Sequence, residues 1–179
     1  PANRMVIHTI TDEFVVDDVA DIKDPLGMIG HRLEAKSMII DAFAPAVKNI
    51  TRAVEVAGGG IAGLIFSPIA AARSVFSKNQ RELGTVLVDV GFSTTGIALY
   101  QEHKLLHTNI FPYGSGHITN DLTHGLKISV EAAEGVKLAY GAAFAKDVAV
   151  RETVDISKFE PHARGSIGRR YIADIMEVR

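Results

Sequence analysis

Residues 86–100 carry the pattern that most constrains the fold of this chain: a strand, a tight polar turn and a second strand. Val86 to Val90 is almost entirely β-branched or apolar, which is typical of a strand buried on both faces. Residues 97–100 predict the returning strand. The segment between the two strands is rich in glycine and hydroxyl side chains, and it follows one acidic residue, Asp89. The pattern therefore predicts a hairpin whose turn presents polar groups.

This polar turn has two interpretations. Gly91 can adopt a positive φ and let the backbone approach an anion, while Ser93, Thr94, Thr95 and the N–H groups of the turn can donate hydrogen bonds to phosphate oxygens. Asp89 could hold Mg²⁺ through water, because Mg²⁺ keeps much of its hydration shell. The alternative is an ordinary hairpin whose turn simply needs glycine and threonine. The run alone leaves both interpretations open.

The bulk composition excludes several classes of protein. The chain has 179 residues, 47% of them hydrophobic, which is enough for one sizeable core or two small ones. A formal net charge of -2 gives no basic field that would attract nucleic acid. The absence of cysteine excludes disulfides and thiolate metal sites and is compatible with a reducing cytoplasm. No apolar stretch reaches the roughly 18 residues of a membrane span. The chain starts at Pro1 rather than at an initiator Met, as an excised segment would.

The order of predicted elements indicates an α/β or α+β fold. Strands are predicted at residues 5–10, 14–16, 33–40, 64–66, 86–90, 97–100 and 105–111, with a further candidate at 148–154. Helices are predicted at 45–57, 67–76, 118–126, 130–140 and 167–178. Residues 17–24 are expected to be a loop or an edge strand, and residues 77–84 a charged loop.

Two further motifs each have a functional and a structural interpretation. Residues 58–63 match G-x-G-x-x-G, but a dinucleotide-binding dehydrogenase would need a strand before the motif and a helix after it. Because a helix is predicted before it, a helix cap and loop is the better interpretation. Glu134 and Lys137 lie three residues apart on one predicted helix, so they could clamp a ribose hydroxyl or form a surface ion pair.

Together these features resemble one protein family over nearly the whole chain. Four segments are similar to the FtsA family of bacterial cell-division proteins. They are the turn Asp24-Pro25-Leu26-Gly27-Met28-Ile29-Gly30, the hairpin at 86–100, the glycine turn at 112–116 and the helix Glu134-Gly135-Val136-Lys137. That family lies within the actin/Hsp70 ATPase superfamily. The resemblance implies an α/β fold: one actin-like, RNase H-like ATPase half with part of a small FtsA-specific α+β subdomain. Residues 1–41 would end that subdomain, residues 42–113 would form the core of the second actin-like half, and residues 114–179 would form its outer lobe.

The resemblance also implies ATP and Mg²⁺ as cofactors. It assigns nucleotide contacts to Asp89, Gly91, Phe92, Ser93, Thr94, Thr95, Gly114, Ser115, Gly116, Glu134 and Lys137, with Asp89 holding the metal through water. Phe92 and Ser93 stand where the family often has glycine, and so does Ser115. Ser67 stands where the relative MreB has a glutamate that positions water, and serine is no comparable general base. We therefore expect ATP binding with slow or absent hydrolysis.

The partners that the resemblance implies are those of a division adaptor. They are the C-terminal tail of FtsZ, other division proteins, further copies in actin-like filaments, and the inner face of the cell membrane through a C-terminal helix absent from this chain. Arg164, Arg169, Arg170 and Arg179 could offer charge to the acidic FtsZ tail, or simply form a solvated basic face. The alternatives are a PilM- or MreB-type assembly protein and a sugar-kinase-type phosphotransferase, which would need an aspartate base.

Overall fold

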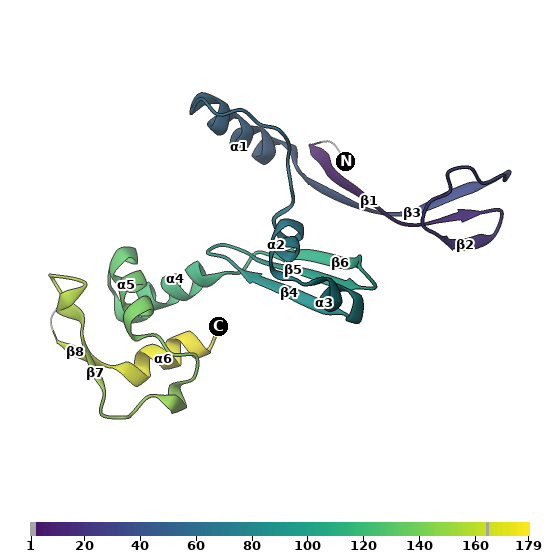
Figure 1. Cartoon of the computed structure of the whole chain (residues 1–179). Coiled ribbons are helices and arrows are strands. Elements are labelled where there is room, and N and C mark those ends of the chain that lie inside the picture. Colours follow the sequence, from purple (N-terminus) through teal and green to yellow (C-terminus); the bar gives the residue numbers. More distant parts are fainter. Residues whose placement is uncertain (1–2, 164) are drawn as a thin grey trace. The chain divides into compact units, whose positions relative to one another are not determined.

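The computed structural model describes residues 3–163 and 165–179, which divide into two units (Figure 1). Unit 1 contains the residues up to 88 together with 97–109, and unit 2 contains 89–96 and 110–179. Three strands contribute residues to both units, β4 (Thr85–Val90), β5 (Thr95–Gln101) and β6 (Lys104–Phe111), and they form one sheet in the order β4-β5-β6. The hairpin predicted at 86–100 is thus confirmed.

A second sheet in unit 1 has the order β2-β1-β3, built from β1 (Arg4–Val16), β2 (Val19–Ile22) and β3 (Leu33–Phe43). The sequence predicted two short strands where β1 is continuous. Register shifts between Val6 and His8 and between Thr11 and Glu13 allow the strand to continue through its polar middle. Asp17 and Asp18 have φ of 46° and 71°, which suits the tight two-residue turn from β1 to the edge strand β2.

The helices of unit 1 are α1 (Ala44–Val56), α2 (Ser67–Val75) and α3 (Lys78–Leu83). The first two confirm the predicted helices, and each has a proline in its first turn. The loop predicted at 77–84 is wrong, because Ser77 and Gln80 form a capping box that starts α3. The strand predicted at 64–66 is also wrong: these residues pair with no strand among the described residues, and Ile65 is 70% exposed.

The glycine-rich motif after α1 is a helix end. Gly58 has a φ of 84° and its N–H donates to the carbonyl of Glu55 (2.9 Å). A helix precedes the motif, and residues 59–66 form neither helix nor strand. The order of elements that a dinucleotide site requires is therefore missing from this part of the structure.

The small core of unit 1 lies on one side of the β4-β5-β6 sheet. Leu87 packs there with Ala72, Ala98 and Tyr100. Val86 and Val88 remain 55% and 59% exposed. The prediction that both faces of β4 are buried is therefore wrong for the described residues. Both faces of an apolar strand are buried only where a second layer of structure covers the other face of the sheet.

Unit 2 is built around three helices, α4 (Ser115–Leu126), α5 (Val130–Tyr140) and α6 (Arg169–Glu177), all close to the predicted positions. The region 144–161 holds two 3₁₀ turns, Ala145–Asp147 and Ile156–Lys158, and β7 (Thr153–Asp155), which pairs antiparallel with β8 (Ser166–Gly168). Strand β7 is shorter than the candidate at 148–154. The core of the unit consists of Leu122, Ile128, Ala132, Ala133, Val136, Val154, Ile156 and Ile172.

Candidate functional site

Two turns of unit 2 are joined through their main chains. The Gly91 N–H donates to the carbonyl of Thr94 (2.9 Å), which closes the hairpin turn. The Ser115 N–H donates to the Gly91 carbonyl (2.9 Å), and the Gly116 N–H donates to the Phe92 carbonyl (2.7 Å). The Thr95 hydroxyl adds a bond to the carbonyl of Tyr113 (2.7 Å). The structure therefore brings together the two turns that the sequence assigned separately to one site.

Glycine is required at this junction by close packing. A Cβ on Gly114 would lie 2.6 Å from the Phe92 carbonyl oxygen, and one on Gly116 would lie 2.8 Å from the Phe92 ring. The expectation that Gly91 adopts a positive φ is wrong, since Gly91 is not among the glycines with that geometry. A Cβ there would instead meet the Thr94 carbonyl at 3.0 Å, so the tightness of the turn explains the glycine.

The N–H groups of the two turns differ in availability. In the second turn, the Gly114 N–H donates to Nδ1 of His117 (3.2 Å), and those of Ser115 and Gly116 donate to the first turn. In the first turn, residues 92–94 are exposed and their N–H groups have no acceptor among the described residues. A ligand therefore finds free donors on the first turn, whereas the second turn holds the first in place.

Asp89 lies near the end of β4, two residues before this turn, and its side chain is exposed. It forms no ion pair with a described residue. No three metal-binding side chains converge anywhere within residues 3–163 and 165–179. Asp89 would thus be a single carboxylate facing solvent, which fits a hydrated Mg²⁺ better than a directly caged ion.

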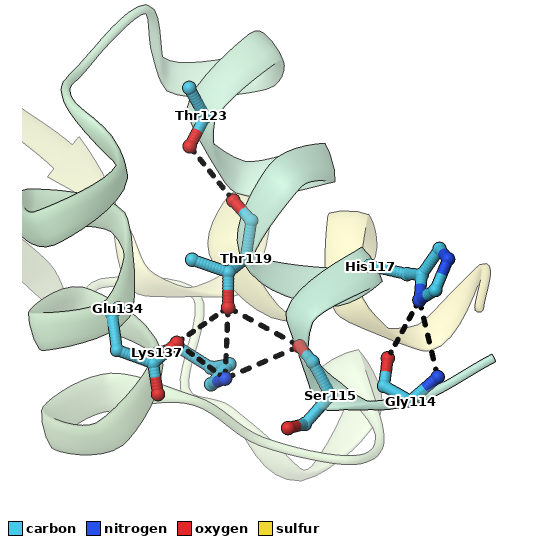
Figure 2. A network of polar contacts seen from close by, with 7 residues as sticks. All are labelled: Gly114, Ser115, His117, Thr119, Thr123, Glu134 and Lys137. Atoms are coloured by element: carbon cyan, nitrogen blue, oxygen red, sulfur yellow. Dashed lines mark hydrogen bonds and ion pairs between the residues drawn. The ribbon is translucent and has the colours of Figure 1, made fainter. Parts of the chain in front are cut away.

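A polar network connects α4 and α5 (Figure 2). The Lys137 ammonium contacts the Glu134 carboxylate (2.6 Å) and donates to the Thr119 hydroxyl (2.9 Å) and the Ser115 carbonyl (3.3 Å). The Thr119 hydroxyl lies 2.5 Å from Glu134 and 3.2 Å from the Ser115 carbonyl. Through Ser115, the network is joined to the first residue of α4 and hence to the turn beside Gly91.

Burial makes this pair different from a surface ion pair. The Lys137 side chain is only 9% exposed, whereas that of Glu134 is 35% exposed. Hydrogen bonds from Lys137 and then Thr119 hold the pKa of Glu134 below its ordinary value. Lys137 therefore holds Glu134 in position, and Glu134 is the member of the pair whose side chain is accessible to a ligand.

Thr119 was missed by the sequence analysis. It is 1% exposed, the only polar residue buried to that degree among those described, and it bonds to both ends of the network. The sequence offered no clear signal for it, because the predicted helix began at residue 118. Only the observed start of α4 at Ser115 places Ser115 and Thr119 four residues apart on one helix face.

The arginines assigned to partner binding have different surroundings. Arg169 pairs with Glu152 (2.6 Å) and donates to the Tyr140 carbonyl (3.0 Å), while Arg179 forms a two-pronged bond with Asp121 (2.8 and 2.9 Å). These bonds lower the pKa of the Glu152 and Asp121 carboxyls. Arg170 is exposed and makes no ion pair with a described residue. Arg164 lies outside the described residues.

The fold places the chain in the actin-like class of ATPase folds. It is similar to a chain of the "PilM-PilN type IV pilus biogenesis complex", with a TM-score of 0.62, 18% identity, and coverage of 78% of this chain and 39% of that one. It is also similar to MreB 5 of Spiroplasma citri, solved bound to AMPPNP, with a TM-score of 0.53, 17% identity, and coverage of 75% and 42%.

Sequence comparison defines the family within that class. The model of "Cell division protein FtsA" matches residues 86–177, and that of the "SHS2 domain inserted in FTSA" matches residues 1–41. The chain belongs to the FtsA family of cell-division proteins. The FtsA protein of Pseudomonas aeruginosa is 33% identical over 179 residues, which is all of this chain and 43% of that protein. The chain therefore spans less than half the length of that relative. None of the described helices is long and apolar enough to span a membrane.

Proposed function

We propose that this chain supplies part of an ATP site in an actin-like cell-division adaptor. The observation that carries the proposal is the exposed turn at 92–94, whose free N–H groups are held in place by the glycine turn at 114–116. Successive free N–H groups of this kind form an anion-binding surface suited to phosphate. The AMPPNP bound to MreB 5, a protein of similar fold, supports a nucleoside triphosphate as the ligand.

Each polar group at the site has a role in this proposal. The turn N–H groups and the hydroxyls of Ser93 and Thr94 donate to phosphate oxygens, and Asp89 binds water on Mg²⁺. Glu134 accepts from a ribose hydroxyl, while Lys137 holds Glu134 in place. Ser67 is exposed at the first residue of α2 and supplies no general base at neutral pH, so hydrolysis is expected to be slow.

Replacing Asp89 by alanine is expected to weaken Mg²⁺-ATP binding by about tenfold or more, which corresponds to ~1.4 kcal/mol. The titration uses the full-length protein, because residues 1–179 match 43% of the relative from P. aeruginosa. Phosphate release is followed in the same samples. Asp174→Ala, at an exposed position on α6, is the matched control and should bind like the wild type. If the Asp89→Ala protein binds Mg²⁺-ATP as tightly as the wild type, Asp89 is not part of the site. Rapid phosphate release by the wild type would contradict the prediction of slow hydrolysis.

The adaptor part of the proposal concerns binding partners. Membership of a cell-division family supports binding of the FtsZ tail, association with further copies and other division proteins, and action at the inner face of the membrane. On this proposal Arg170 is the arginine of α6 that meets the tail, because the guanidinium groups of Arg169 and Arg179 already hold internal carboxylates.

Arg170→Glu is expected to weaken binding of an FtsZ tail peptide about three- to tenfold, because it replaces an attractive charge at the rim of the contact by a repulsive one. Arg169→Glu is unsuitable as a test, since it would also break the contact with Glu152. Fluorescence anisotropy of a labelled peptide at two salt concentrations measures the effect. The control is Arg151→Glu, a charge reversal at an exposed position outside α6. Unchanged affinity in the Arg170→Glu protein would exclude Arg170 from the interface.

A further inference from the structure

Unit 1 contains a cavity of about 370 Å³ that is lined by α2, α3, strands β5 and β6 with the turn between them, and strands β1 and β3. None of the residues proposed to contact ATP lines it. Its lining combines apolar side chains, among them Ile10, Met38 and Ile69, with several cationic ones. Its size is at the lower end of cavities that hold small molecules.

The charges around this cavity are unbalanced. Arg73, Arg81 and Lys104 line it, and the one carboxylate in its lining is that of Asp12. Asp12 is paired with Lys104 at 3.4 Å. Neither Arg73 nor Arg81 forms an ion pair with any described residue. Two guanidinium charges therefore face one cavity without a protein counter-ion.

Arg81 also has an unused hydrogen-bond donor. Its Nε is buried and has no acceptor among the described residues. Buried donors in proteins are almost always paired, because an unpaired one loses its bond to water and gains nothing in exchange. An acceptor supplied by a ligand would remove this penalty.

Tyr100 provides a further donor at the same place. Its side chain is nearly buried at 6% exposure and lines the cavity, and its hydroxyl has no hydrogen-bond partner among the described residues. Burial raises the pKa of Tyr100, while the nearby charges of Arg73 and Arg81 act in the opposite direction. The phenol therefore stays protonated and can donate beside the two guanidinium groups.

We propose that this cavity binds the phosphoryl group of a small molecule, with Arg73, Arg81 and Tyr100 as donors. A phosphoryl group carries a charge of about -1.5 to -2 at neutral pH and presents several acceptor oxygens, which matches two uncompensated guanidinium charges and a phenol. The apolar side chains in the lining can contact the organic part of a phosphate ester. The site is distinct from the proposed ATP site, and its test uses no nucleotide.

The experiment titrates the full-length protein, without nucleotide, with inorganic phosphate and, separately, with glycerol phosphate, at an ionic strength held constant with sodium chloride. Calorimetry gives the dissociation constant, and the midpoint of thermal unfolding gives an independent readout. Saturable binding is expected, at least about fivefold weaker in Arg81→Gln and in Arg73→Gln. Arg52→Gln changes an exposed arginine of α1 in the same unit and should bind like the wild type.

The two probes separate the possible sources of the phosphoryl group. Tighter binding of glycerol phosphate than of inorganic phosphate assigns the site to an ester, and the reverse assigns it to free phosphate. Tyr100→Phe and the exposed Arg73→Gln keep the test decisive if Arg81→Gln fails to fold. Two results would overturn the proposal. One is that the wild type shows no saturable binding; the other is that Tyr100→Phe and Arg73→Gln bind the probes with the affinity of the wild type.

Discussion

Gly114→Ala is expected to destabilise unit 2 by about 2–3 kcal/mol, the upper part of the range for an added carbon in a packed site. The new Cβ would lie 2.6 Å from the Phe92 carbonyl oxygen, which is a main-chain atom and cannot move aside like a flexible side chain. The two turns would have to separate, and the bonds from the Ser115 and Gly116 N–H groups would lengthen. Amide hydrogen exchange at these two residues, together with urea unfolding, measures the effect.

The control for this substitution is Gly168→Ala in the same unit. Gly168 has an ordinary φ of -60°, and a Cβ there would have no neighbour within 4 Å. We expect it to change stability little and to leave exchange at Ser115 and Gly116 unaltered. If both alanine variants unfold alike, the junction of the two turns is not as tight as the described contacts indicate.

Lys137→Met is expected to destabilise unit 2 by about 2 kcal/mol. Breaking a fully buried ion pair costs about 3–5 kcal/mol, and the partial exposure of Glu134 reduces that figure because water can solvate the remaining carboxylate. The Thr119 hydroxyl and the Ser115 carbonyl also lose the hydrogen bonds that they accept from the ammonium. Urea unfolding measures the loss, with the exposed Lys158→Met as the matched control. A loss no larger than that of the control would contradict the structural role of Lys137.

The pH dependence of this loss tests its cause. Hydrogen bonds from Lys137 and Thr119 lower the pKa of Glu134 in the folded state below the ordinary value of 4.5. The resulting stabilisation is complete above the pKa of the unfolded chain and disappears as the pH falls through the lower folded pKa. The difference in unfolding free energy between wild type and Lys137→Met should therefore narrow below about pH 4.5. A difference that stays constant in acid would assign the effect to packing alone.

The elements that the sequence predicted well are those whose signal is local. Helices α4, α5 and α6 each have apolar residues at helical spacing, and those faces supply five of the eight core residues of unit 2. Helix α3 has only six residues and no such face, but its Ser77–Gln80 capping box could have been recognised in the sequence.

The failures are those where the outcome depends on residues far away in the sequence. An apolar run such as 64–66 forms a strand only beside a partner, and burial of Val86 and Val88 needs a covering layer. The candidate site shows the same division. The polar turn between the two strands could be predicted from local composition, whereas its junction with residues 113–116 and the bonds of Thr119 depend on contacts between separate elements.

Ser115 takes part in the junction and in the polar network through main-chain atoms alone. Its N–H donates to Gly91 and its carbonyl accepts from Lys137 and Thr119, while its hydroxyl bonds to no described residue. A helical residue contributes these same main-chain atoms whatever its side chain. Small residues can therefore replace one another at position 115 during evolution. The presence of serine or glycine there says little about whether two members of the family share the same site.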